Sequence, residues 1–411
     1  MAKQAKSKNK KRRISKRKVL RLVLVLALII YGPIALIQYC GDDEARKLSK
    51  NPEQILPHIN DSLQNDRSTF EGSARMDSMI DKYLKRWEIN GAQLAVSRND
   101  SLVYVKGYGW AEMETNQRMQ PQNILRIASV SKLITAVGIM RLREMGKLQL
   151  SDHVFGPQGV LNDSTYTNVI TDKRYFDITI EDLLRHKAGF TRAAGDPVFS
   201  TRYIMMQNHL STPPDHKTLL RIVLKRRLGY DPGCDMQKYC NIGYLLLSMI
   251  IEKRSGMSYE EFIQRNVLYP AGCFDFHIAG NYYKDRLPNE VKYYMHKEAE
   301  PIYEFNNSGR MVVKCYGEND ITSAAGAAWV ASAAELCHFV SAIDGDKRYP
   351  DVISEESVNM MTEDKGDHRF SLGWNFTPKG KPWTRTGTLS GSSALVVRYP
   401  DTNQCWVLIT N

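Results

Sequence analysis

The stretch at residues 127–136, IASVSKLITA, decides how the rest of the chain is interpreted. Apolar residues recur at helical spacing from Val130 onward, so the stretch predicts an extended run that turns into a helix at Ser129. Lys132 follows Ser129 by three residues and therefore shares its face of the helix. Ser129 also lies at the positive end of the helix dipole, where a developing anion is favoured. A weak nucleophile, a nearby base and an electropositive helix end are the components of acyl transfer.

The spacing S-x-x-K is a weak indication of this chemistry when it stands alone. It occurs again at residues 7–10 and 15–18, inside a basic segment where it carries no such meaning. By itself it also fits an ordinary helix N-cap at Ser129 and a solvated amine at Lys132. The predicted helix is apolar on most faces, however, which argues against a freely solvated Lys132.

Composition limits the class of protein. The 411 residues carry a formal net charge of +11, but the first 21 residues hold 11 Lys or Arg and no acidic residue. The 45 basic residues that remain balance the 45 acidic ones. The basic character is therefore local and typical of a targeting segment, and nothing in the composition predicts a nucleic-acid partner.

An uncharged apolar run at residues 22–39 follows the basic tail of residues 1–21. It fits a cleaved signal peptide, a lipoprotein signal ending at Cys40, or an uncleaved anchor. We favour a single-pass anchor, because the run is long and no small-residue cleavage site follows it. The positive-inside rule then places the tail in the cytoplasm and the rest outside it, with a linker at residues 40–73 and a domain at 74–411. The predicted location is the inner membrane of a bacterium, with the domain in the periplasm.

Cysteines and histidines give no pattern of a metal or cofactor site. Besides Cys40, six cysteines lie beyond the predicted anchor, without compact spacing, and we expect buried thiols with at most one disulfide. The histidines show neither H-x-H nor H-E-x-x-H spacing, so we predict no metal and no cofactor.

Strand patterns occur near both ends of the chain, with helical patterns between them. Residues 76–87 predict a helix ended by Gly91, and residues 93–98 and 102–106 predict a hairpin closed by residues 107–110. Further helices are expected at 180–184, 218–228, 244–254, 259–267 and 331–343, and a strand meander at 381–388, 393–399 and 404–410. This order predicts an α+β fold: one antiparallel sheet built from both termini, flanked by helices, with a mostly helical region inserted in the middle.

Two further motifs lie far along the chain from Ser129. Tyr239 and Asn241 precede a predicted helix and can project together into a cleft, although a tyrosine is more often part of the core. Arg385, Thr386 and Gly387 lie on the first strand of the meander, where the glycine allows close approach of a substrate backbone and the amide of Thr388 can join that of Ser129 as an oxyanion hole. The alternative is a cationic edge strand with a glycine bulge.

With these three motifs in this order, the chain resembles the penicillin-binding and serine β-lactamase superfamily, in particular the class C β-lactamase and D-alanyl-D-alanine carboxypeptidase/esterase branch. That branch carries S-x-x-K, Y-x-N and K-T-G or H-T-G. The resemblance covers about residues 76 to 411. It is supported by the stretches at residues 107–111, 146–148, 183–189, 232–233, 323–326 and 372–374.

The resemblance implies a role for each motif residue. Ser129 would form an acyl-enzyme, Lys132 would take its proton, and Tyr239 would share the proton relay, with either of the latter two as the base. Asn241 would orient Lys132 and the substrate amide, and Arg385 would help to bind an anionic substrate group. Thr386, Gly387 and Thr388 would line the substrate site.

Three departures from the family pattern stand out. Arg385 replaces Lys or His and cannot relay a proton, which disfavours efficient β-lactam hydrolysis but not acyl transfer. His186 stands where the branch usually has a small hydroxyl residue, and we interpret it as structural. The sequence ends at Asn411, directly after the last predicted strand, where family members usually continue into a helix over the sheet. We therefore expect either a trimmed chain or another element that shields that face.

The motifs and the export signal together predict a membrane-tethered serine hydrolase. Its predicted substrates are D-amino-acid peptides of the cell wall or small esters. One alternative is a true class C-type β-lactamase, and another is a non-catalytic sensor of cell-wall fragments on the same fold. The sequence leaves the oligomeric state open.

Overall fold

The computed structural model describes residues 59–65, 68, 72–192, 195–322, 326–363 and 370–411. These residues belong to one compact unit, which begins at His58. The predicted tail and anchor lie outside the described residues, so both stay predictions. Within the described part, no helix has the length and apolar character needed to cross a membrane.

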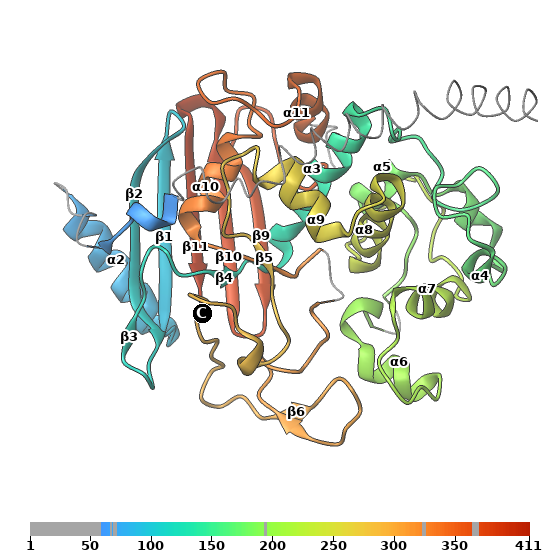
Figure 1. The fold of residues 1–411 in the computed structure, drawn as a ribbon, viewed down its shortest axis with the longest axis horizontal. Helices are drawn as coiled ribbons and strands as arrows, with labels where there is room; N and C mark the ends of the chain where they lie inside the picture. The colour runs from blue at the N-terminus through green and yellow to red at the C-terminus, as the bar shows by residue number, and fades with distance from the viewer. Residues whose placement is uncertain (1–58, 66–67, 69–71, 193–194, 323–325, 364–369) are drawn as a thin grey trace, which may run out of the picture. The chain divides into compact units, whose positions relative to one another are not determined.

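A six-stranded antiparallel sheet in the order β3-β2-β1-β11-β10-β9 joins the two ends of the compact unit (Figure 1). Its central pair is β1 against β11, in a register that sets Ala95 opposite Val407. The sheet therefore combines strands from both ends of the sequence, and the predicted α+β architecture is confirmed. The strands are β1 (Gly91–Arg98), β2 (Ser101–Glu112), β3 (Gln117–Arg118), β9 (Trp383–Leu389), β10 (Ser392–Tyr399) and β11 (Gln404–Thr410).

The two faces of the sheet are covered by different helices, because side chains alternate along each strand. On one face, α2 (Ser73–Trp87) packs Leu84 against Leu94 and Val96. The other face packs into the main core with α10 (Ala333–Ser341). The face beside α2 also holds an apolar groove of about 610 Å³, and Trp406 is 37% exposed there.

The helical region lies between the two groups of strands in sequence and beside β9 in space (Figure 1). Its centre is α8 (Asn241–Ser255), which is apolar on nearly all sides and buried from Asn241 to Ile251. Around it are α3 (Ser131–Glu144), α4 (Ser164–Thr167), α5 (Ile180–Leu184), α6 (Thr201–Gln207), α7 (His216–Leu224) and α9 (Tyr259–Ile263), and α11 (Glu355–Thr362) follows later in the chain. Short strands form two further sheets: β4 (Leu125–Arg126), β5 (His277–Ile278) and β8 (Trp329–Ala331), and β6 (Ile302–Tyr303) with β7 (Met311–Val312).

The predicted boundaries of the first hairpin need correction. Gly91 does not end the helix but begins β1, because α2 already stops at Trp87, where Glu88 adopts a left-handed conformation (φ 52°). Residues 107–110 do not close the hairpin, because they continue β2, where residues 107–109 pair with β1 and Trp110 pairs with β3. An added Cβ on Gly107 would lie 2.4 Å from the carbonyl oxygen of Met119, so a crossing backbone explains this glycine.

The predicted linker at residues 40–73 also needs correction at its C-terminal end. Asn60 is buried and donates from Nδ2 to Asp275 (2.6 Å). Asn65 donates to the carbonyl of Met119 (2.8 Å), and Ser68 is buried against Val105. Polar side chains predicted a tether, but here they are satisfied by hydrogen bonds to the folded unit.

The cysteines of the described residues form no disulfide. All six in that part of the chain are free thiols, and only Cys234 is partly exposed. This agrees with the expectation of buried thiols.

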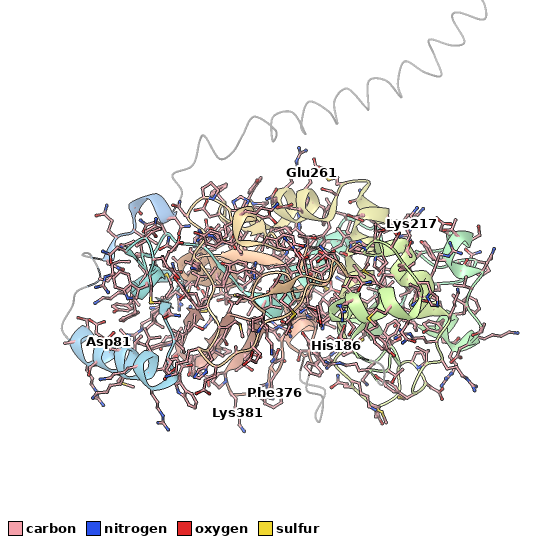
Figure 2. All side chains as sticks on the ribbon, turned by 90° about the horizontal axis from the view of Figure 1, so that it is seen from below. Asp81, His186, Lys217, Glu261, Phe376 and Lys381 are labelled. Atoms are coloured by element: carbon pink, nitrogen blue, oxygen red, sulfur yellow. The ribbon has the colours of Figure 1, made fainter. Side chains whose placement is uncertain are left out.

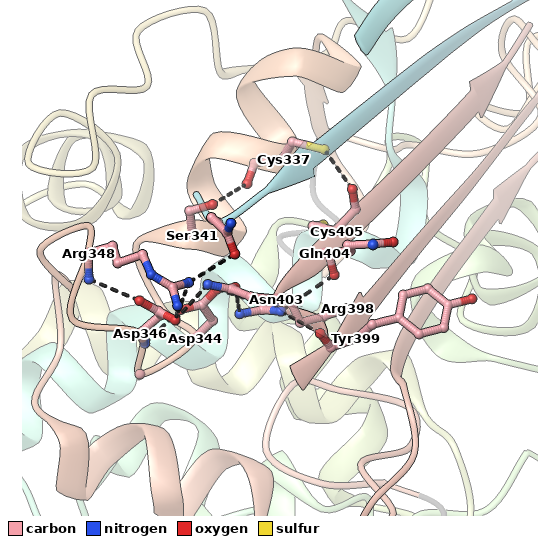
Figure 3. A network of polar contacts seen from close by, with 12 residues as sticks. Cys337, Ser341, Asp344, Asp346, Arg348, Arg398, Tyr399, Asn403, Gln404 and Cys405 are labelled. Atoms are coloured by element: carbon pink, nitrogen blue, oxygen red, sulfur yellow. Dashed lines mark hydrogen bonds and ion pairs between the residues drawn. The ribbon is translucent and has the colours of Figure 1, made fainter. Parts of the chain in front are cut away.

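A polar network fixes the loop after α10 to the turn between β10 and β11 (Figure 3). Arg398 donates from Nε to Asp344 (2.7 Å) and also bonds Asn403. Asp351 accepts from the amides of Asp344 (3.2 Å) and Gly345 (3.0 Å). Burial and the charge of Asp344 raise the pKa of Asp351 to about 7, and burial raises that of Asp344 to about 6.

This network predicts that stability falls as pH rises through these values. The folded state binds a proton at Asp351 that the unfolded chain, with an ordinary carboxyl pKa, releases near pH 4. The stabilisation is therefore complete below about pH 4 and is lost as pH rises towards 7. We expect Asp351→Asn to reduce the fall in Tm between pH 5 and pH 8, measured by calorimetry. Asp401→Asn, on the exposed surface, is the control, and an unchanged fall in Asp351→Asn would contradict the prediction.

Candidate active site

Ser129 lies where the edge strand β9 meets the helical region. In Figure 2, Phe376 marks the sheet side of this junction and His186 the helical side. Ser129 is part of a short 3-10 turn, η4 (Ala128–Val130), directly before α3. Ala128 has a φ of 48°, which is strained for a residue with a Cβ. Such strain is typical of sites that hold the next side chain in one orientation.

The hydroxyl of Ser129 has an amine and a phenol within hydrogen-bond distance. Nζ of Lys132 lies 3.2 Å from Oγ of Ser129, and the Tyr239 hydroxyl donates to the same oxygen at 2.7 Å. Lys132 is fully buried, whereas Ser129 and Tyr239 are partly exposed. A reactant can therefore reach the hydroxyl while the amine stays beneath it.

Lys132 has two acceptors in addition to its contact with Ser129. It donates to Oδ1 of Asn241 (2.7 Å) and to the carbonyl of Gly326 (2.8 Å). Burial, aided by the charge of Arg385, lowers the pKa of Lys132 below the ordinary 10.5 against the opposing effect of Tyr239. An added Cβ on Gly326 would lie 3.1 Å from Nζ, so the carbonyl approaches this closely because the residue is glycine.

Tyr239 is held by aromatic neighbours. Its ring centroid lies 4.5 Å from that of His186 and 5.6 Å from that of Phe370. Burial opposes ionisation of the phenol, but the charges of Lys132 and Arg385 outweigh it, and the pKa of Tyr239 is lowered.

His186 acts as a support for Tyr239. Its Nδ1 accepts from the amide of Cys240 (3.4 Å), and its carbonyl accepts from the amide of Lys238 (3.0 Å). Burial lowers the pKa of His186 well below its ordinary range, so the ring is neutral. These contacts agree with the structural role that we expected for this residue.

Arg385 points towards Ser129 but contacts its backbone. Nε and Nη2 both donate to the carbonyl of Ser129 (2.8 and 2.6 Å), and Nη1 donates to Oδ1 of Asn375 (2.7 Å). The side chain is only 1% exposed. Each guanidinium nitrogen therefore has a hydrogen-bond partner within the protein. The sequence had predicted instead that Arg385 binds an anionic group of the substrate.

Gly387 allows β9 to approach Ser129 closely. An added Cβ would lie 2.3 Å from the carbonyl oxygen of Ile127 and 2.7 Å from the amide nitrogen of Ser129. The backbone amide of Thr384 donates to the carbonyl of Phe376 (2.9 Å), on the side of β9 away from β10. Amides two residues apart on a strand point the same way, so that of Thr388 also faces the free edge of β9. The exposed Thr386 and Thr388 lie on this edge, where Thr386 accepts from Asn375 (2.8 Å).

The structure brings together the sequence-predicted residues Ser129, Lys132, Tyr239 and Asn241, and places β9 beside them. Their catalytic and binding roles stay predictions. Sequence reasoning missed Asp196, which is buried and accepts from Nδ2 of Asn241 (2.9 Å). The only signal was an acidic residue before Pro197, which reads as an ordinary turn.

Fold and site together define a protein of the β-lactamase and penicillin-binding class. A family model described as Beta-lactamase matches residues 76–411. The chain therefore belongs to the Beta-lactamase family, and the superfamily predicted from the three motifs is confirmed.

Individual relatives are distant. Penicillin-binding protein 4* of Bacillus subtilis (strain 168) is 24% identical over 354 residues, which are 82% of this chain and 71% of that protein. Protein flp of Staphylococcus aureus (strain COL) is 23% identical over 359 residues, 84% of this chain and 64% of flp. The crystal structure of D-amino acid amidase from Ochrobactrum anthropi SV3 complexed with D-phenylalanine is similar with a TM-score of 0.62 and 18% identity, covering 82% of this chain and 91% of that one.

Gly387→Ala should impair the site without unfolding the protein. The new Cβ would collide with the backbone on both sides of Ala128, so β9 must retreat from Ser129. We expect the rate of covalent labelling by a serine-reactive fluorophosphonate to fall by about 100-fold, as for loss of an oxyanion donor. The control is Gly229→Ala, where the nearest heavy atom to an added Cβ is 3.4 Å away. Equal rates in the two variants would contradict this account of β9.

Arg385 should set the pH at which the site becomes active. A base at Lys132 must be neutral, so labelling by the same probe should rise with pH below the ordinary lysine value of 10.5. Arg385→Gln removes a cation that lowers the pKa of Lys132, so this rise should move to higher pH. Arg385→Lys keeps the charge and should move it less. The pH dependence of the labelling rate constant is the measurement, and a shift of Arg385→Gln to lower pH would refute the assignment.

Proposed function

We propose that this protein is a serine hydrolase that cleaves an amide or ester through an acyl-Ser129 intermediate. The observation that carries the proposal is the position of the Ser129 hydroxyl, 3.2 Å from Nζ of Lys132 and 2.7 Å from the Tyr239 hydroxyl. A nucleophile within reach of two proton-transfer groups at an accessible surface is the arrangement that acyl transfer requires.

The first chemical step is attack of Oγ of Ser129 on the substrate carbonyl carbon. The hydroxyl proton passes to Lys132 or Tyr239, and the carbonyl oxygen becomes an oxyanion near the amides of Ser129 and Thr388. Collapse of this intermediate breaks the bond to the leaving amine or alcohol, which takes up the proton. Water then attacks the acyl-serine, releases the acid and returns the proton to the hydroxyl.

The proposed substrates are D-amino-acid peptides of the cell wall or small esters. The fold of a D-amino acid amidase and the sequence of a penicillin-binding protein among the similar proteins support this class. Arg385 is occupied by Ser129 and Asn375, so we propose that the hydroxyls of Thr386 and Thr388, rather than an ion pair, contact the substrate.

The proposed location is the outer side of a bacterial inner membrane. The basic tail and the apolar run of residues 22–39 support a single-pass anchor. A cell-wall peptide would be accessible to the domain in that position.

Labelling by a fluorescent fluorophosphonate tests the proposed nucleophile. The probe should modify Ser129 in the wild-type chain, identified by peptide mass spectrometry, and Ser129→Ala should abolish the modification. Ser131→Ala is the matched control, because Oγ of Ser131 is buried and accepts from the amide of Trp329 (3.2 Å). Equal modification of Ser129→Ala and the wild type would disprove the acyl-serine mechanism.

Substrate turnover separates this proposal from its two alternatives. A chromogenic cephalosporin should acylate the protein slowly, whereas D-Ala-D-Ala peptides or p-nitrophenyl esters should be turned over. Rapid multiple turnover of the cephalosporin would instead identify a β-lactamase. Saturable binding of cell-wall fragments without any covalent adduct would identify a sensor without catalysis.

A further inference from the structure

Asp196 contacts Asn241 twice, from outside the motifs that identify the family. One oxygen, Oδ2, accepts from the side-chain Nδ2 of Asn241 at 2.9 Å and from its backbone amide at 3.2 Å. Both residues are buried, with 6% and 8% of their surfaces exposed. Asp196 lies in the loop before α6, far from Asn241 in sequence, so this is a tertiary contact.

A carboxylate at this position determines which way the Asn241 carboxamide faces. An ionised carboxylate only accepts hydrogen bonds, so it binds the NH₂ end of the carboxamide and repels the oxygen end. The oxygen Oδ1 must then point in the opposite direction, towards Lys132 at 2.7 Å. Without the carboxylate, either end of the carboxamide could face the amine.

The orientation of Asn241 in turn determines where the lone pair of a neutral Lys132 points. A neutral amine has two N–H donors and one lone pair. Asn241 and the carbonyl of Gly326 accept at 2.7 and 2.8 Å and occupy both donors. The remaining direction faces Oγ of Ser129, at 3.2 Å. A reversed carboxamide would present N–H groups to the amine and attract its lone pair away from the hydroxyl.

We propose that Asp196 is a positioning residue, which fixes the Asn241 carboxamide so that the lone pair of neutral Lys132 faces the proton of Ser129. This inference rests on the proposed acyl-serine function and assigns the general base to Lys132. The negative charge of Asp196 also favours the protonated form of Lys132, and so opposes the effect of Arg385 on its pKa.

Asp196 also has structural contacts, which an experiment must separate from this role. It caps its own 3-10 turn through the amide of Val198 (3.1 Å), and it lies 3.7 Å from Nε of Arg192. Its contact with the amide of Asn241 satisfies one of the first amides of α8, as an N-cap does. If Asp196 had only these structural contacts, its loss would lower stability, and its effect on the labelling rate would not depend on Asn241.

A double-mutant cycle in the full-length chain separates the two roles. The rate constant of fluorophosphonate labelling is measured for wild type, Asp196→Ala, Asn241→Ala and the double variant. If Asp196 acts through Asn241, each single change should slow labelling by about 100-fold, the size of a general-base contribution, and the double variant should match Asn241→Ala within about twofold. Multiplication of the two losses would overturn the proposal. The control is Asp215→Ala, which removes the cap of α7 on Thr218 (2.8 Å) and should leave labelling unchanged.

The pH dependence and the structure of charge-neutral variants give independent results. Asp196→Asn keeps an acceptor but loses the charge, so its labelling should rise at lower pH than in the wild type, opposite to Arg385→Gln. The crystal structure of Asp196→Leu needs no turnover: the Asn241 carboxamide should turn away, so that neither its oxygen nor its nitrogen lies within 3.5 Å of Nζ of Lys132. An unchanged contact would refute the inference, even if the probe fails to label the protein. Failure of the probe to label the protein would, by itself, count against the proposed function.

Discussion

The close approach of Gly387 to the backbone of Ile127 and Ser129 is the contact on which the site depends. It joins the edge of the sheet to the turn before α3, across more than half of the chain. Because the sheet itself pairs β1 with β11, the two ends of the unit must both be in place before β9 can reach Ser129. The surroundings of Ser129 are therefore assembled by tertiary structure, and the strained Ala128 is buried among them.

Two buried cations beside one hydroxyl would be unfavourable unless each had partners or lost its charge. Arg385 cannot lose its proton and is satisfied instead by the carbonyl of Ser129 and by Asn375. Lys132 can lose its proton, and burial together with Arg385 lowers its pKa. The guanidinium thus fixes the backbone of Ser129 and, through its charge, favours the neutral form of Lys132, which the proposed role as a base requires.

Most of the fold follows from sequence patterns, because periodicity and turn residues are local. The hairpin at Asn99 and the apolar helix α8 are examples, and the order of three motifs identified the family. Contacts between segments that are distant in sequence leave no such local pattern. The sequence around Gly107 predicts the end of a strand, but the glycine is required by the crossing backbone of Met119. The sequence predicts that Arg385 binds an anion, but its guanidinium donates to the carbonyl of Ser129. Asp196 precedes Pro197 as in an ordinary turn, and no local pattern indicates its contact with Asn241, which lies 45 residues away.

The side chains of Ser129, Lys132 and Tyr239 also differ in their exposure to solvent. Ser129 and Tyr239 are partly exposed and Lys132 is not, so a substrate of the proposed hydrolase would meet the two hydroxyl groups before the amine. An amine that is sealed from solvent cannot be reprotonated directly by water, and its proton must travel through Ser129 or Tyr239. In the proposed mechanism the partly exposed phenol, which donates to Ser129 at 2.7 Å, would then be the route by which a proton leaves Lys132 for the departing group. If the proposed acyl-serine function holds, Lys132 and Tyr239 are successive parts of one relay, and a change at either one should affect both acylation and the release of product.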